Sequence, residues 1–266
     1  MVNIVVGIKW VPDTVDVKFD SEKGTLIRAG VESVINPPDL NAIEMALTLR
    51  DEYGGKVFIV SMAPPSAIEG LKMAIAMGAD EAILISDKKF AGADTLATSY
   101  TLAKALQKIS NVDFAIFGEE TIDSSTGHIG PEVGEVLNVA HLSYVKKIEI
   151  NQKEKNAILF RDVEDGSEVF ESSLPIVISV AVGTNTPRYP IPIRRLLTEV
   201  KTEDYIKTWH FDDLQADPDR VGLKGSPTKV VKVKAAPMPA RRREIFDFSE
   251  KGIEMIIKKL SEVDIG

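Results

Sequence analysis

The chain has 266 residues, of which 32 are Lys or Arg and 40 are Asp or Glu, so its formal net charge is −8. This acidic balance argues against a nucleic-acid-binding protein that neutralises phosphates with a broad basic surface. The chain has no cysteine, which excludes disulfides, thiolate nucleophiles and Cys-ligated clusters. We therefore expect any redox chemistry to depend on a bound organic cofactor.

Metal and membrane sites are not expected either. The histidines are His128, His141 and His210, which lie far apart in sequence, so a His-based metal site is disfavoured. No apolar run approaches the ~20 residues that cross a bilayer, and the N-terminus lacks the features of a signal peptide. We expect a cytoplasmic protein with no direct membrane insertion.

The first half of the chain alternates between buried strands and amphipathic helices. Residues 17–28 interrupt the pattern with a hairpin. We expect Asp39 to cap the first helix, which should end at Gly54. The second helix should begin with a capping box of Ser66 and Glu69. Asp94 should cap the third helix. Continuous apolar runs predict strands at 4–8, 57–60, 82–85 and 114–117, and a further helix carries Ile129, Val133 and Val136.

This alternation predicts an α/β fold: a Rossmann-like, doubly wound and mostly parallel sheet. The sequence also predicts antiparallel strands added to this sheet, at residues 143–150, 156–162 and 167–173. A buried strand at 176–180 follows them. Residues 200–248 show little periodicity, which favours an extended arm. We therefore expect a nucleotide-binding domain over 1–200 and a C-terminal arm and helix over 201–266. The apolar stripe of that helix, which Ser249 caps, packs either on its own domain or on another chain.

The candidate site lies at the ends of the predicted strands. The loops at 7–13, 36–39, 61–66, 90–99 and 118–131 are rich in Gly, Ser, Thr and Asp and would meet at one edge of the sheet. Hydroxyls and backbone N–H groups at helix starts suit phosphate and ribose. The run from Asp123 to Pro131 is the strongest candidate for a pyrophosphate site. Its His128 is either a proton donor near a cofactor or a solvated capping residue. No dinucleotide G-x-G-x-x-G motif or P-loop lysine motif is present.

These residues closely resemble the β subunit of electron transfer flavoproteins over essentially the whole chain. The similarity rests on Val6 to Asp13, on Asn36 to Asp39 with Ala42 and Glu44, on Ser61 to Pro65, on Ala76 to Asp80, on Asp123 to Pro131, and on Leu174-Pro175 followed by Asn185 to Pro190. The stretch from Phe90 to Thr101 is similar to the bifurcating, FAD-binding branch. The chain departs from that branch at Ser124, Ser125, Gly127 and His128, and its segment from Pro190 to Arg195 and the following Lys-poor stretch also differ.

The resemblance implies that the chain works with an α subunit that holds a second FAD. It implies that FAD binds here, accepts hydride from NADH and passes electrons to ferredoxin or flavodoxin and to the α-subunit FAD. An acyl-CoA dehydrogenase-like or quinone-reducing partner would take electrons from the complex. The alternatives are a non-bifurcating subunit that holds structural AMP, or a stand-alone adenine-nucleotide-binding regulatory domain.

The resemblance also assigns residues. Ile191, Ile193 and Arg194 would dock a partner, although Ile191 and Ile193 could instead be buried at the start of a helix. The cofactor residues are Gly7, Asn36, Asp39, Ser61, Met62, Thr95, Thr98, Asp123, Ser124, Ser125, Thr126, Gly127, His128, Ile129 and Gly130.

Overall fold

A computed structural model of the chain describes residues 1–13, 18–20, 25–27, 32–228, 245–247 and 249–261. The chain divides into two compact units, Met1–Val231 and Lys232–Gly266. No helix within the described residues is long and apolar enough to cross a membrane.

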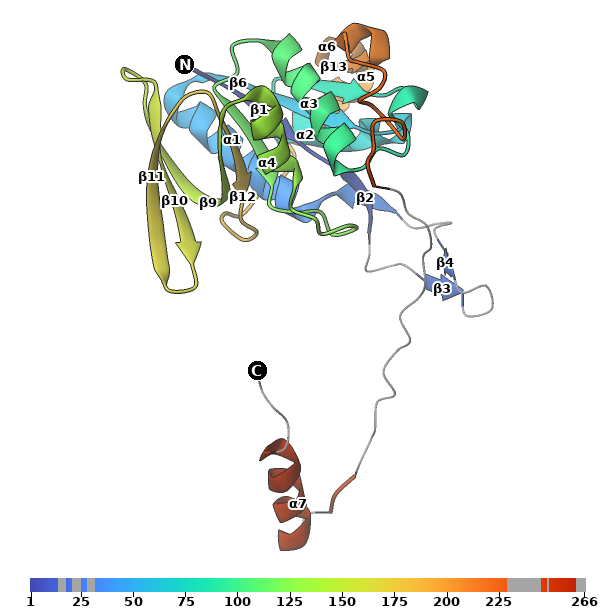
Figure 1. The fold of residues 1–266 in the computed structure, drawn as a ribbon, viewed down its shortest axis with the longest axis vertical. Helices are drawn as coiled ribbons and strands as arrows, with labels where there is room; N and C mark the ends of the chain where they lie inside the picture. Colours follow the sequence, from blue (N-terminus) through green and yellow to red (C-terminus); the bar gives the residue numbers. More distant parts are fainter. Residues whose placement is uncertain (14–17, 21–24, 28–31, 229–244, 248, 262–266) are drawn as a thin grey trace. The chain divides into compact units, whose positions relative to one another are not determined.

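The first unit is built on a nine-stranded sheet with the order β11-β10-β9-β12-β8-β1-β6-β7-β13 (Figure 1). The strands from β9 to β13 in this order are parallel, and β10 runs antiparallel to both β9 and β11. The strands are β1 (Val2–Gly7), β6 (Gly55–Met62), β7 (Glu81–Ile85), β8 (Phe114–Gly118), β9 (Ala140–Asn151), β10 (Asn156–Val163), β11 (Gly166–Ser173), β12 (Ile176–Val180) and β13 (Ile206–Trp209). This confirms the predicted doubly wound sheet with an antiparallel addition.

Helices cover both faces of the sheet (Figure 1). On one face, α1 (Pro37–Tyr53) and α2 (Ile68–Met77) pack with Ile4 and Val6 of β1 in one core. On the other face, α3 (Thr95–Ile109) and α4 (Ile129–Leu137) pack with Val5 in a second core. Successive residues of a strand point to opposite faces. A strand covered on both faces is therefore apolar throughout, as the sequence of β1 is.

Smaller elements complete the unit. β2 (Trp10–Pro12) pairs with β5 (Ser33–Ile35), and β3 (Lys18–Asp20) pairs with β4 (Thr25–Ile27), which supplies the hairpin expected at 17–28. The remaining elements are the 3₁₀ turns η2 (Pro65–Ala67), η3 (Lys88–Phe90) and η4 (Phe211–Leu214) with the helices α5 (Pro192–Val200) and α6 (Thr202–Tyr205).

The compact unit that contains the sheet extends past residue 200, where the sequence predicts a domain boundary. The first unit continues to Val231, because β13 adds to the edge of the sheet in parallel with β7. The described residues beyond β13 also return to the unit: the Leu223 N–H donates to Ala91 O at 3.1 Å, and the Thr228 N–H donates to Asp94 Oδ2 at 3.0 Å.

The predicted helix caps have mixed outcomes. Asp94 caps α3 by accepting a hydrogen bond from the Ala97 N–H at 3.1 Å, as predicted. Asp39 does not cap α1, which begins after Asn36, and the capping box of Ser66 and Glu69 does not form, because α2 begins after Ala67. In the second unit, Ser249 Oγ accepts a hydrogen bond from the Gly252 N–H at 3.1 Å in the first turn of α7 (Glu250–Ser261), which confirms the predicted cap.

Candidate functional site

The carboxyl ends of β1 and β8 form the point where the strand order reverses. From β1 the chain continues through β6 to β7 on one side, and β8 then returns to the other side of β1. The loops that leave β1 and β8 therefore diverge, and a crevice at such a switch point is where open α/β sheets bind ligands. The loop after β1 contains Lys9, and the loop after β8 runs from Gly118 to the start of α4.

Asn36 and Asp39, at the start of α1, join these diverging loops. The Asp39 carboxylate accepts hydrogen bonds from the Lys9 N–H at 2.7 Å and from the Gly118 N–H at 3.2 Å. The Asn36 amide donates to Glu120 O at 2.9 Å and accepts from the Ile122 N–H at 3.0 Å. Both side chains are buried, so they support the two loops from inside the fold rather than from its surface.

The burial of Asp39 has a clear electrostatic consequence. Removal from water raises the pKa of its carboxyl to about 7, even though the N–H groups of Lys9 and Gly118 favour the ionised form. Gly118 must be glycine in this arrangement, because a Cβ there would lie 2.4 Å from Asp39 Oδ1 and 2.8 Å from the Pro38 carbonyl carbon.

The loop after β8 presents hydroxyls on an open surface. Ser124, Ser125, Thr126 and His128 are exposed, whereas Gly130, inside the first turn of α4, is buried. Ser125 and Gly127 take left-handed backbone conformations, with φ of 47° and 64°. These turns, together with the hydrogen bond from the Ser125 N–H to Thr121 O at 2.7 Å, bring the loop to the N-terminus of α4. N–H groups and hydroxyls at a helix start are suited to an anion.

Lys9, in the loop after β1, and Asp123, in the loop after β8, form an ion pair. Lys9 Nζ lies 2.7 Å from both Oδ1 and Oδ2 of Asp123. Partial burial alone would raise the pKa of Asp123, but the Lys9 ammonium, together with hydrogen bonds from Thr121 and Ser124, holds the pKa below its usual range. No local pattern in the sequence indicates this pair, because its members are 114 residues apart.

Ser61, at the carboxyl end of β6, carries an unsatisfied hydroxyl. Ser61 Oγ is buried and has no hydrogen-bond partner within the described part of the chain. Buried hydroxyls are normally paired, so an unpaired one at this edge of the sheet suits a ligand contact. Met62 follows it and is half-buried. Gly7, at the end of β1, leaves room for the Phe117 ring, whose Cε1 would lie 2.2 Å from a Cβ there.

The threonines expected near a cofactor lie at the start of α3. Thr95 Oγ1 donates to Glu132 Oε1 at 3.0 Å, and Ser99 Oγ donates to Glu132 Oε2 at 2.9 Å, which ties α3 to the first turn of α4. Thr98 is half-buried in the same turn of α3. Sequence reasoning missed Glu132, although an acidic residue in the first turn of a predicted helix was a usable signal.

The structure brings most of the predicted residues to one edge of the sheet. The ends of β1, β6 and β8 and the starts of α1, α3 and α4 all lie there, since these strands are parallel. Asn36 and Asp39 support the loops, whereas Asp123 to His128 line the open surface. Sequence reasoning also missed Lys9 as a site residue. It is the first charged residue after the buried β1 strand, which was the available signal.

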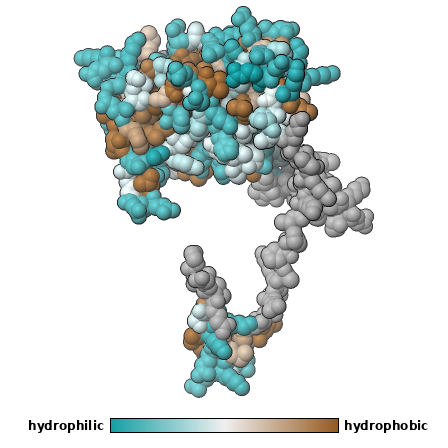
Figure 2. All heavy atoms as spheres, viewed as in Figure 1, coloured by the Kyte–Doolittle hydropathy of each residue, from teal (hydrophilic) through white to brown (hydrophobic). Residues whose placement is uncertain are grey.

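The predicted docking residues lie at the start of α5. Ile191 and Ile193 are exposed, but the Arg194 guanidinium donates to Ile75 O at 3.0 Å and Ala79 O at 2.6 Å at the end of α2. Exposed apolar side chains continue along the helix, with Val200 80% exposed. We call the set the α5 apolar surface: Tyr189, Ile191, Ile193, Leu196, Leu197 and Val200. Elsewhere hydrophobic and hydrophilic residues are intermixed on the face in view in Figure 2.

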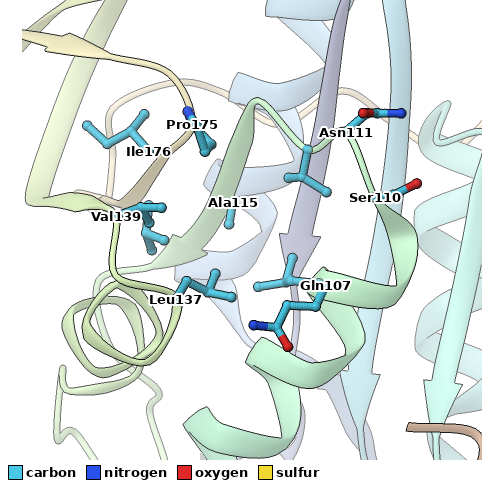
Figure 3. Close-up of a pocket in the computed structure, with 11 residues that line it drawn as sticks. Gln107, Ser110, Asn111, Ala115, Leu137, Val139, Pro175 and Ile176 are labelled. Carbon is cyan, nitrogen blue, oxygen red and sulfur yellow. The ribbon is translucent and has the colours of Figure 1, made fainter. Parts of the chain in front are cut away.

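A hollow of about 250 Å³ lies elsewhere, between the C-terminal ends of α3 and α4 (Figure 3). It is at the amino ends of β8 and β12, the edge opposite the candidate site. Its lining is mainly apolar: Leu106, Gln107, Ser110, Asn111, Val112, Ala115, Leu137, Val139, Pro175, Ile176 and Val177. It is therefore separate from the crevice at the switch point.

Fold and crevice together define a doubly wound α/β protein with its candidate site at the topological switch point. Comparison with known proteins makes this more specific. A profile of the electron transfer flavoprotein domain matches residues 23–206. The chain is 41% identical to electron transfer flavoprotein subunit beta of Clostridium acetobutylicum over 98% of each chain. It is 41% identical to caffeyl-CoA reductase-Etf complex subunit CarD of Acetobacterium woodii over 88% of each, and 40% identical to FixA of Azotobacter vinelandii over 91% of this chain and 87% of that one. The chain belongs to the electron transfer flavoprotein β-subunit family, which confirms the resemblance.

Proposed function

We propose that this chain is an electron-transferring β subunit that binds FAD at the carboxyl edge of its sheet and works with an α subunit. In the complex, FAD on this chain would accept hydride from NADH, and the two electrons would go to a low-potential acceptor, ferredoxin or flavodoxin, and to the α-subunit FAD. The observation that carries the proposal is the pair of loops after β1 and β8, which Asn36 and Asp39 hold in place at the switch point of the sheet in a chain of this family.

The residues at the crevice fit a dinucleotide. The hydroxyls of Ser124, Ser125 and Thr126 and the N-terminus of α4 would hold the pyrophosphate. The unpaired Ser61 hydroxyl would contact the adenosine part, with Gly7 and Met62 beside it. FAD supplies the hydride- and electron-accepting ring when bound, and the protein supplies its position and local charge.

The stretch around the start of α3 is our reason for proposing FAD rather than the smaller AMP. The stretch from Phe90 to Thr101, similar to the bifurcating branch, lies beyond the pyrophosphate loop and would extend the site past a nucleoside monophosphate. Thr98 would approach the flavin, and Thr95 would do so through its hydrogen bond to Glu132. These contacts favour FAD. AMP as a purely structural ligand is the second candidate, because it needs only the loops around β1, β6 and β8.

Partner binding would use two separate features of the chain. The α5 apolar surface is a continuous set of exposed side chains, as suits docking of an electron-donating or electron-accepting protein. An acyl-CoA dehydrogenase-like or quinone-reducing protein would be that partner. The amphipathic α7, with Ile253, Ile257 and Leu260 exposed within its own unit, would pack on the α subunit together with the arm before it.

Counting the bound cofactors tests the proposal. The chain is co-expressed with its α subunit, and flavin and AMP are extracted from the purified complex. Two FAD per heterodimer, with bleaching of the flavin absorbance by NADH, are the expected result. One FAD and one AMP would show the non-bifurcating alternative. A monomer that binds ATP tightly and never associates with an α subunit would instead favour a stand-alone regulatory domain.

A further inference from the structure

The loop proposed to hold the phosphates lacks a cation of its own. Residues 118–131 contain Glu119, Glu120 and Asp123 but no Lys or Arg. A nucleotide phosphate placed there would face carboxylates, and the N-terminus of α4 supplies only partial positive charge. A balancing cation would have to come from another part of this chain or from the α subunit.

Lys9 is placed to supply it. It follows the end of β1, and its ammonium reaches the loop after β8, 2.7 Å from the Asp123 carboxylate. Its backbone is fixed on both sides: the N–H donates to Asp39 at 2.7 Å, and the carbonyl accepts the Asn36 N–H at 2.9 Å. Two buried polar residues thus fix the backbone of Lys9, and only its side chain is free to change partners.

The Lys9–Asp123 pair is easily rearranged. Both side chains are partly exposed, at 44% and 30%, and ion pairs in contact with water contribute little to stability. A bound phosphate would be held at the same time by the N-terminus of α4, so the ammonium would not have to balance its charge alone. The ammonium would then offset the charge of the phosphate, and the released Asp123 carboxylate, which is partly exposed, would be solvated by water.

We propose that Lys9 is the residue that selects phosphate-bearing ligands, an inference that rests on the proposed function. The Lys9 ammonium pairs with the phosphate of the bound nucleotide, and it pairs with Asp123 when no nucleotide is bound. Two consequences follow. Loss of Lys9 weakens binding of AMP but not of adenosine. Loss of the Asp123 charge strengthens binding of AMP, because the competitor is removed, and has no such effect in a chain that lacks Lys9.

The test is calorimetric titration of the full chain in complex with its α subunit, freed of bound nucleotide by dialysis, with AMP and with adenosine as probes. Lys9→Met should weaken AMP binding about tenfold, the size of one charge-assisted hydrogen bond, and leave adenosine binding unchanged. Asp123→Asn should tighten AMP binding several-fold, and the double variant should match Lys9→Met. Lys88→Met, which removes an exposed lysine from the loop after β7, is the matched control for charge.

The outcomes separate this inference from the proposed function. If the unmodified complex binds neither AMP nor adenosine, the nucleotide site itself is wrong. If it binds both and Lys9→Met weakens them equally or not at all, Lys9 has no role in phosphate selection. The same conclusion holds if Asp123→Asn weakens AMP binding or if Lys88→Met matches Lys9→Met. Unchanged adenosine binding also reports that each variant is folded.

Discussion

The buried Asp39 carboxyl should make the stability of the protein fall as pH rises. Its pKa is 3.8 in the unfolded chain and about 7 in the fold, because the side chain is removed from water. Between these values the folded state keeps a proton that the unfolded state has lost. Stability from this group is therefore fully present below pH 3.8, and it is lost as pH rises towards 7. The difference between the two pKa values corresponds to ~4 kcal/mol in the free energy of unfolding.

Urea denaturation of the full chain at a series of pH values from 4 to 8 measures the effect. The quantity of interest is the difference in free energy of unfolding between the native chain and Asp39→Asn, because the variant cannot ionise at this position. We expect the native chain to lose ~4 kcal/mol in free energy of unfolding relative to the variant as pH rises. Asp165→Asn, in the exposed turn between β10 and β11, is the control for loss of one carboxylate.

A flat difference, or one that moves in favour of the native chain, would refute this reasoning. It would mean that the hydrogen bonds from Lys9 and Gly118 dominate over burial and keep Asp39 ionised. Infrared spectroscopy of a chain with isotopically labelled aspartate provides a second measurement that needs no folded variant. A protonated carboxyl band that disappears near pH 7 is the expected result.

Substitutions at three further positions test the site and its surroundings. Gly118→Ala places a Cβ 2.4 Å from Asp39 Oδ1 and should lower the free energy of unfolding by ~1–3 kcal/mol in urea titration; an unchanged midpoint would contradict this packing. Gly130→Leu should abolish nucleotide retention by crowding the first turn of α4, whereas Gly130→Ala, whose Cβ has room, should retain it; full cofactor content in the leucine variant would remove Gly130 from the site. Ile191→Ala should slow electron transfer to the external partner while bound cofactor stays at the native level, and unchanged transfer rates would exclude it from docking.

The arrangement of strands and helices was predictable because its signals are local. The apolar runs of β1, β6, β7 and β8 and the intervening helices are each visible within short windows of sequence. Parallel pairing then places their ends at one edge without further information. β13 was missed because it is short and only Ile206 of its residues is buried. It is a strand because β7 offers an open edge, which is a tertiary effect.

The roles of individual site residues were less predictable. Asp39 follows two prolines at a helix start, a local context that favours a cap, but its partners Lys9 and Gly118 are 30 and 79 residues away in sequence. The Lys9–Asp123 pair is equally non-local. The composition and order of the loops therefore predicted where the site lies. Which residues support the loops and which face a ligand could be told only from the folded structure.

The chemistry of the switch point explains why a buried carboxyl belongs there. When neighbouring parallel strands end and their loops diverge, the N–H groups of Lys9 and Gly118 lose the partners that a continuing sheet would provide. Unpaired buried N–H groups are costly, and one acceptor that reaches both must come from a third element, which here is the first turn of α1. That acceptor fixes the spacing of the loops before any ligand arrives. A change at Asp39 should therefore disturb the position of Lys9 and the start of the phosphate loop together, whereas a change at Ser124 or Thr126 should affect ligand contacts alone.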